Sequence, residues 1–115
     1  MRAAGALLLT IGLAACSASP ALAADKLRCA INEAPDRACT MTDRVEGGVH
    51  HMEFRIEGEA LVTFVGRSQT GWWSGTLNGR SAMGYERNRG NMTFSTTDLQ
   101  TTFAWWYPDQ AHGTY

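Results

Sequence analysis

Two adjacent histidines in the stretch "HHMEF", His50 and His51, are the first side chains in this sequence that offer metal-binding chemistry. Neighbouring residues of a strand point to opposite faces of the sheet, so these two rings cannot bind one ion from regular β geometry. His51 and Glu53 share a face, but they supply only two ligands. We therefore assign no metal ligand and expect no cofactor.

Methionine is a second side chain with an affinity for metal, because thioether and imidazole ligands together suit copper. A copper- or zinc-handling protein is therefore one alternative interpretation. The methionines also fall on the apolar face of the strands predicted below, where methionine fills gaps in a core. We expect a core role for Met41, Met52, Met83 and Met92.

The three cysteines form one lone residue and one closely spaced pair. Cys16 lies in the N-terminal apolar region, where it is cut away or carries a lipid. An oxidising compartment would join Cys29 to Cys39, and the short loop that they close is worth about 2.8 kcal/mol in the loop-entropy description. Nothing else in the chain has the spacing of thiolate metal ligands, so we predict a disulfide.

Catalytic chemistry has little support in this sequence. No serine follows the pattern of a nucleophile elbow, and the predicted disulfide leaves no catalytic thiol. Glu53 and Glu57 have strand spacing, but surface glutamates alternate in this way for solubility. We predict no catalytic residue and no enzyme.

The elements that must position these side chains are short strands. Turn-forming residues recur about every ten positions, which is the rhythm of an all-β domain. We predict strands at 26–31, 38–45, 49–57, 60–66, 71–77, 80–86, 91–97 and 101–107. The predicted fold is a single antiparallel meander that closes into a barrel or a sandwich, since closure removes exposed edges.

Turns predict part of the strand register. The pair at 78–79, Asn-Gly, suits a type I′ turn, in which both central residues have positive φ; it places Trp73 opposite Gly84. A turn at 47–48 places Met41 opposite Phe54, and folding 26–31 back places Cys29 opposite Cys39. Phe94 is expected to meet Phe103. The predicted core face of these strands carries Cys29, Cys39, Met41, Phe54, Phe94, Phe103 and Trp105.

Four tryptophans are many for a chain of this length. Joining "YERNRGNM" as a longer hairpin loop puts Tyr85 near Met92 on the core side, and a flat opposite face then carries small residues flanked by tryptophans. That face holds Trp73, Gly75, Ala82, Gly84, Thr93, Ser95, Ala104 and Trp106. Exposed aromatic patches mark binding surfaces, so we predict binding residues at Trp73, Trp106 and Arg80. The alternatives are that Trp73 merely covers Gly84 or that a terminal segment covers the face.

The first 23 residues carry two overlapping export signals. Arg2, a short apolar run and "ALA" at 21–23 are typical of a secretory signal peptide that is cut before residue 24. "LAAC" at 13–16 instead resembles a lipobox, in which residues 1–15 are removed and Cys16 is lipidated. We predict one domain over 24–115, periplasmic or secreted, with an outer-membrane lipoprotein as the alternative.

The charges are nearly balanced, with 10 Lys and Arg against 11 Asp and Glu. This balance gives no basic footprint for nucleic acid and no polybasic membrane patch. No apolar segment reaches the roughly 20 residues of a transmembrane helix. The expected partner is therefore a protein or a glycan at the cell envelope.

In general layout, residues 24–115 are similar to the small bacterial inhibitors of c-type lysozyme, which are exported or lipid-anchored β-barrels with a disulfide. The stretch nearest to that family's "SASGxxY"-like inhibitory loop is "RSAMGYE" at 80–86. The spacing departs from the pattern, because Tyr85 follows Gly84 directly, and Ser81 is predicted to face the core. The resemblance therefore implies protein binding as an option and does not carry the inhibitory role over to this chain.

Taken together, these features predict a small exported envelope protein that acts as a non-catalytic, protein-binding module of inhibitor-like or accessory type. A glycan-binding module that uses exposed tryptophans is the first alternative, and metal handling is the second.

Overall fold

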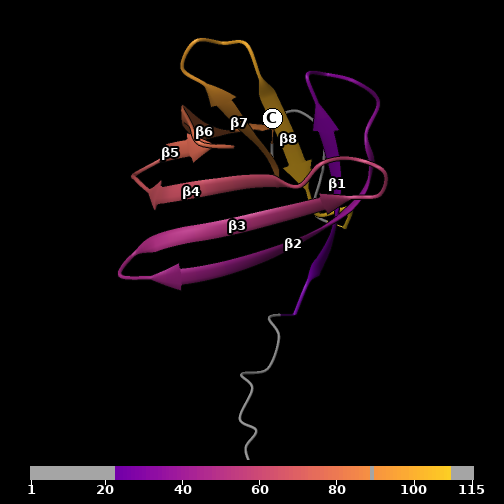
Figure 1. Cartoon of the computed structure of the whole chain (residues 1–115), viewed down its shortest axis with the longest axis horizontal. Helices are drawn as coiled ribbons and strands as arrows, with labels where there is room; N and C mark the ends of the chain where they lie inside the picture. The colour runs from indigo at the N-terminus through magenta and orange to yellow at the C-terminus, as the bar shows by residue number, and fades with distance from the viewer. Residues whose placement is uncertain (1–22, 89, 110–115) are drawn as a thin grey trace, which may run out of the picture.

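The computed structural model describes residues 23–88 and 90–109, which form eight strands and no helix. The strands are β1 (Asp25–Ile31), β2 (Arg37–Glu46), β3 (Val49–Ile56), β4 (Val62–Ser68), β5 (Trp73–Leu77), β6 (Arg80–Asn88), β7 (Asn91–Thr96) and β8 (Thr102–Trp106). Each strand pairs antiparallel with the next, and β8 returns to β1, so the sheet is a closed barrel (Figure 1). The all-β prediction is confirmed, and the closure selects the barrel over the sandwich. Residues 1–22, which include Cys16 and all but the last residue of the predicted export signals, lie outside the described residues.

Two turns with positive φ fix the registers that flank them. The residues at 78–79 have φ of 49° and 82° and join β5 to β6 in the predicted register. The residues at 47–48 have φ of 58° and 82° and place Met41 opposite Phe54, again as predicted. Local turn chemistry therefore determines both hairpins.

The Cys29–Cys39 disulfide is confirmed, with the two Cα atoms 6.0 Å apart. The predicted β1–β2 register is wrong by two residues, because Leu27 lies opposite Cys39 and Cys29 lies opposite Arg37. The chain turns early, at 32–33, where both residues have positive φ. A shift of two residues keeps each side chain on its face, so both sulfur atoms still point inward and bond diagonally.

The predicted connection between β6 and β7 is also wrong, by a single residue. Met92 lies opposite Glu86, and Tyr85 lies opposite Thr93, with a register shift just after Glu86. An extra residue of this kind is a β-bulge, and a slip of one residue exchanges the two faces of the strand. Met83 and Tyr85 are therefore exposed, with 41% and 37% of their surface accessible, rather than in the core.

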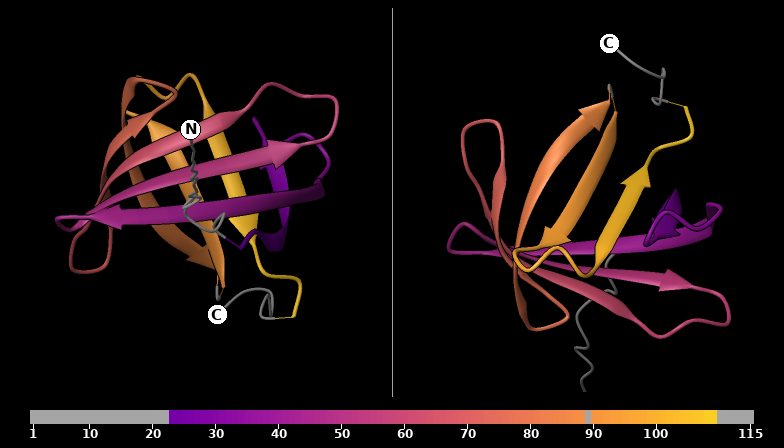
Figure 2. Two further views of the ribbon diagram at one scale, coloured as in Figure 1. Left: turned by 60° about the horizontal axis from the view of Figure 1, so that its bottom comes forward. Right: turned by 90° about the horizontal axis from the view of Figure 1, so that it is seen from above.

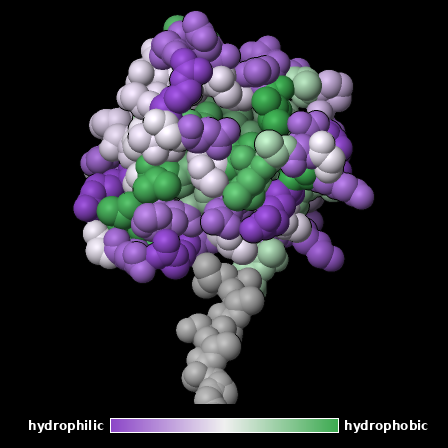
Figure 3. Space-filling model, viewed as in Figure 1, coloured by the Kyte–Doolittle hydropathy of each residue, from purple (hydrophilic) through white to green (hydrophobic). Residues whose placement is uncertain are grey.

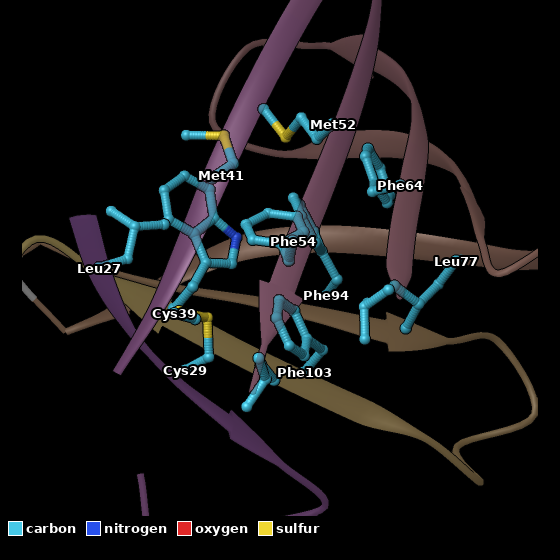
Figure 4. Close-up of a cluster of buried hydrophobic side chains, with 14 residues drawn as sticks. Leu27, Cys29, Cys39, Met41, Met52, Phe54, Phe64, Leu77, Phe94 and Phe103 are labelled. Carbon is cyan, nitrogen blue, oxygen red and sulfur yellow. A yellow bond between two sulfur atoms is a disulfide. The ribbon is translucent and has the colours of Figure 1, made fainter. Parts of the chain in front are cut away.

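Aromatic side chains fill the barrel interior (Figure 4). Phe54, Phe64, Phe94 and Phe103 are at most 1% exposed. The rings of Phe64 and Phe94 stack across the barrel at 3.9 Å and 8°, and Trp105 tilts against Phe54 with ring centroids 5.5 Å apart. Because these rings occupy the interior, binding surfaces must lie at the barrel ends or on the outer wall.

Gly84 is required by the close approach of an aromatic ring. A Cβ atom at this position would lie 2.5 Å from Cδ1 of Phe94 and 3.1 Å from Cβ of Trp73. Any side chain here would displace Phe94 from its stacking partner. The glycine thus allows both aromatic residues to lie against the inner wall.

The barrel has two distinct ends, and its long strands β2–β4 cross the steeper strands β7 and β8 (Figures 1 and 2). One end, which we call the Asn78 end, carries the loops at 32–36, 57–61, 78–79 and 97–101. We call the other the Trp73 end; it carries the turn at 47–48, the connection at 69–72, the β6–β7 turn, the start of β1 and the end of β8.

Candidate binding surfaces

The three predicted binding residues do not lie together. Trp73 points into the barrel at the Trp73 end, where His50, Phe64 and Phe94 surround it at ring-centroid distances of 4.7, 6.1 and 6.3 Å. All three contacts are edge-on, with interplanar angles between 72° and 80°. Trp73 is therefore a partly buried residue in a fixed orientation, and it does not belong to an exposed platform on the outer wall.

The side chain of Trp106 lies on the outer surface of the barrel wall, whereas that of Trp73 lies on the inner surface. It follows buried Trp105 in β8, so alternation directs it outward. Its cross-strand neighbours are Asn91 on β7 and Arg28 on β1. Trp106 is half-buried, and it belongs to the outer face of the barrel as the sequence predicted.

Arg80 begins β6 at the Asn78 end, whereas Trp73 begins β5 and Trp106 ends β8 at the Trp73 end. Its guanidinium forms an ion pair with the Asp98 carboxylate in the β7–β8 loop. Asp98 also accepts hydrogen bonds from the Thr96 hydroxyl at 2.7 Å and the Gln100 amide at 3.0 Å. The Thr96 hydrogen bond is the main cause that holds the pKa of Asp98 below its usual range, followed by Gln100 and Arg80. Arg80 therefore anchors a loop.

The exposed surface on β6, β7 and β8 keeps the β7 and β8 residues of the predicted face, but its β6 residues, Met83 and Tyr85, are ones that the sequence placed in the core. Tyr85 lies opposite Thr93, which lies opposite Ala104, and Met83 lies opposite Ser95. We call this surface the β6–β8 outer face; it comprises Met83, Tyr85, Thr93, Ser95, Ala104 and Trp106. A signal in the sequence that could have revealed this change is "RNRGN" at 87–91, where Gly90 adopts φ of 79° in the turn that follows the register shift.

The floor of the β6–β8 outer face is closely packed even though it faces outward. Thr93 and Ser95 are only 1% and 3% exposed. The Thr93 hydroxyl has no hydrogen-bond partner among the described residues. Ser81 also faces outward and is exposed. The prediction that it faces the core is therefore wrong, because the β6–β7 register differs by one residue from the predicted one.

A second surface is an open depression of about 280 Å³ at the Trp73 end. We call it the Trp72–Trp73 pocket; it is lined by Ser68, Gln69, Gly71, Trp72, Trp73, Glu86 and Met92. The Gln69 amide donates to the Trp72 carbonyl at 2.6 Å, which closes the connection at 69–72 into a tight turn. Gly71 makes that turn possible with φ of 85°.

Polar groups of the Trp72–Trp73 pocket are held by neighbouring atoms. The Gln69 side-chain amide donates to the Ser74 hydroxyl at 3.0 Å. The Glu86 carboxylate accepts from the Gly90 amide at 3.0 Å across the β6–β7 turn. Both side chains are thereby positioned at the edge of the tryptophan surface.

His50 forms a half-buried pair with Asp43 beside Trp73. Its Nδ1 lies 2.8 Å from Oδ2 of Asp43, and the other carboxylate oxygen is buried with no hydrogen-bond partner in the described part of the chain. His51 lies on the other face of β3, next to Val65. Within residues 23–88 and 90–109, no group of three or more His, Cys, Asp and Glu side chains has the geometry of a metal site.

The Asn78 end has two smaller depressions, of about 240 and 140 Å³, that share Ile31 and Glu59. An ion pair at 2.7 Å joins Glu59 to Arg37 across the larger one. Their linings are otherwise mainly aliphatic, and they include Leu61, which is 40% exposed. Neither depression brings together an aromatic surface and several hydrogen-bonding side chains.

No known protein family matches this chain, and neither the curated proteins nor the solved structures yield a match. Among the described residues, no helix is long and apolar enough to cross a membrane. On the face shown in Figure 3, polar side chains surround small clusters of apolar ones.

Proposed function

We propose that this chain is a small exported protein of the cell envelope that acts as a non-catalytic binding module, and that a protein partner docks on the β6–β8 outer face. The observation that carries the proposal is the exposure of Met83 and Tyr85, at 41% and 37%, beside a floor of small, buried side chains. Large contiguous apolar patches on small proteins usually mark interaction sites.

The composition of this face suits a protein interface. Aromatic residues and methionine are enriched at the centre of such interfaces, and charged residues are depleted there. Tyr85, Trp106 and Met83 provide large side chains, whereas none of the residues of the face carries a charge. Tyrosine and tryptophan side chains have only two rotatable bonds and lose little conformational entropy on binding. Tyr85 and Trp106 are therefore the expected anchors.

The shape of the face supports the same proposal. Thr93 and Ser95 lie in the central strand of the three and are almost fully buried, so the floor between the larger side chains is already solid. A partner side chain that enters between Tyr85 and Trp106 would meet packed atoms and would exclude water. Water exclusion around an aromatic anchor is what makes it contribute strongly to affinity.

Export is supported by the signal pattern in residues 1–23 and by the Cys29–Cys39 disulfide, because disulfides persist in oxidising compartments. The intact mass of the protein purified from its native host tests this part. A chain that begins at residue 24 indicates a free periplasmic or secreted protein. A chain that begins at Cys16 with a diacylglyceryl group indicates a lipoprotein, and a chain that retains residue 1 contradicts export.

Site-specific photo-crosslinking in the native host tests the docking face. A photoreactive phenylalanine analogue replaces Tyr85 in one variant and Arg55, an exposed residue on β3, in the control. We expect a discrete crosslinked protein from position 85 that is absent from position 55. Trp106→Ala, added to the position 85 variant, should reduce that product. Equal products from both positions, or none from position 85, would contradict the proposal.

A further inference from the structure

We propose that the Trp72–Trp73 pocket is a saccharide-binding site in which one sugar ring stacks on the indole of Trp72. The site uses inward-facing residues at the barrel end and a connecting loop, and it shares no residue with the β6–β8 outer face. Saccharide binding at the pocket therefore goes beyond the docking function, and it does not depend on whether a protein binds the β6–β8 outer face.

The exposure of Trp72 is the first observation that favours this ligand. Trp72 is 43% exposed at the edge of a depression, although the loop that carries it is closed by the hydrogen bond from the Gln69 amide to the Trp72 carbonyl. The backbone of Trp72 is thus fixed in place. An aromatic face carries partial negative charge, so it attracts the polarised C–H groups on the apolar side of a sugar ring.

The orientation of Trp73 is the second observation. His50, Phe64 and Phe94 contact it edge-on, and the closest of them, His50, is itself held by Asp43 at 2.8 Å. A side chain with several fixed neighbours loses little freedom when a ligand arrives, and such preorganisation favours binding. Trp73 therefore forms a rigid inner wall for the pocket.

The polar edge is the third observation, and it distinguishes a sugar from a purely apolar ligand. Ser68, Gln69 and Glu86 place a hydroxyl, an amide and a carboxylate around the aromatic surface. Glu86 accepts from the Gly90 amide, which holds its carboxylate at the edge of the aromatic surface. Sugar rings present hydroxyls at their edges and C–H groups on their faces, which matches this arrangement.

Charge and size restrict the class of saccharide. Among the described residues that line the pocket there is one carboxylate and neither lysine nor arginine, so a neutral sugar fits better than an acidic one. The volume of about 280 Å³ lies just below the roughly 300–1,000 Å³ that is typical of small-molecule sites. The pocket therefore suits one ring of a neutral oligosaccharide, with neighbouring rings outside it.

Nuclear magnetic resonance titration of the exported protein with maltotriose, cellotriose and chitotriose tests the proposal. We expect at least one trisaccharide to shift the indole N–H signals of Trp72 and Trp73 and the backbone amides of 68–73, with millimolar affinity. Trp72→Ala should weaken this binding about tenfold or more, as expected for loss of an aromatic anchor. Gln69→Ala should weaken it to a lesser extent.

Trp106→Ala is the matched control, because it removes an indole from the outer wall and leaves the pocket intact. Its trisaccharide affinity should equal that of the unaltered protein. The proposal is overturned if none of the three sugars shifts the pocket signals, if the shifts centre on Trp106, or if binding survives both Trp72→Ala and Gln69→Ala. Binding of p-cresol without binding of any trisaccharide would likewise overturn it, since that result identifies an apolar site.

Discussion

Two tryptophan pairs lie at the Trp73 end of the barrel, and each pair is divided between the interior and the surface. In the first, Trp73 packs inside and Trp72 is 43% exposed. In the second, Trp105 is 7% exposed within the core and Trp106 faces outward. The two pairs differ in what directs the exposed indole.

Strand geometry alone directs Trp106. Trp105 and Trp106 are consecutive residues of β8, so the pleat sends them to opposite sides. Trp72 precedes β5 and belongs to the connection at 69–72, where the turn sets its direction. A strand pair of this kind adds an aromatic residue to a flat wall, as Trp106 does in the β6–β8 outer face. A pair at a loop can shape a pocket, as Trp72 and Trp73 do.

The largest expected effect separates the members of the second pair. Trp105→Ala removes a buried indole and should lower the free energy of unfolding by about 3 kcal/mol, the lower part of the usual range, because the indole N–H has no hydrogen-bond partner among the described residues. Trp106→Ala should cost less than about 1 kcal/mol. Urea unfolding followed by circular dichroism measures both, and equal losses would contradict the assignment of inner and outer residues.

The disulfide provides the next largest effect and links the second pair to the core. The double variant with Cys29→Ala and Cys39→Ala should lose about 2.8 kcal/mol. Cys29 lies directly opposite Trp105, so this loss should couple with Trp105→Ala by about 0.5 kcal/mol or more, whereas its combination with Trp73→Ala should be additive. A double-mutant cycle in urea measures the coupling, and equal coupling at both tryptophans would remove the distinction.

The first pair should show a smaller separation in stability. Trp73→Ala removes contacts with Phe64 and Phe94 and should cost about 1–2 kcal/mol, while Trp72→Ala should change stability by no more than about 0.5 kcal/mol. Thermal unfolding of the two variants provides the measurement. If Trp72→Ala proves the more damaging of the two, the indole of Trp72 supports the fold and is not available to a ligand.

The smallest effect concerns Tyr107, which follows the second pair and donates a hydrogen bond to Asp25 at 2.6 Å. Burial, and then this hydrogen bond, raise the pKa of Tyr107 from 10.0 to about 12. The folded state therefore keeps the proton longer than the unfolded state, and the stability it contributes below pH 10 is lost as the pH rises through 12. Melting temperatures across that interval should fall less steeply for Tyr107→Phe, and identical slopes would show that Tyr107 contributes nothing.

Local chemistry made much of the fold predictable. The Asn-Gly turn at 78–79 and the Gly-Gly turn at 47–48 adopt the positive φ angles that their residue types favour, so both hairpins follow from a few residues. The disulfide requires only that Cys29 and Cys39 lie close together on one face of the sheet. The two-residue error in the predicted register did not change that face, so the predicted disulfide is still correct. Alternation then identified Phe54, Phe94 and Trp105 as core residues.

The candidate sites were less predictable, because they depend on one residue in the β6–β7 connection. The stretch "YERNRGNM" is compatible with a simple loop and with a bulge, and these two place Tyr85 on opposite faces. The bulge is favoured by packing across the barrel, where Phe94 lies against Gly84 and stacks on Phe64. Phe64 is 20 positions earlier in the chain than Gly84, so no local pattern contains this contact.

The sequence by itself determined the strands, the turns at 47–48 and 78–79, the disulfide and the outward direction of Trp106, because these depend on short-range periodicity and backbone preference. Only the tertiary structure decided that Trp73 lies inside, that Met83 and Tyr85 join the β6–β8 outer face, and where the pocket lies. The physical reason is that closing the barrel allows one strand register to fill the interior with rings, and that register fixes which side of β5 and β6 faces water.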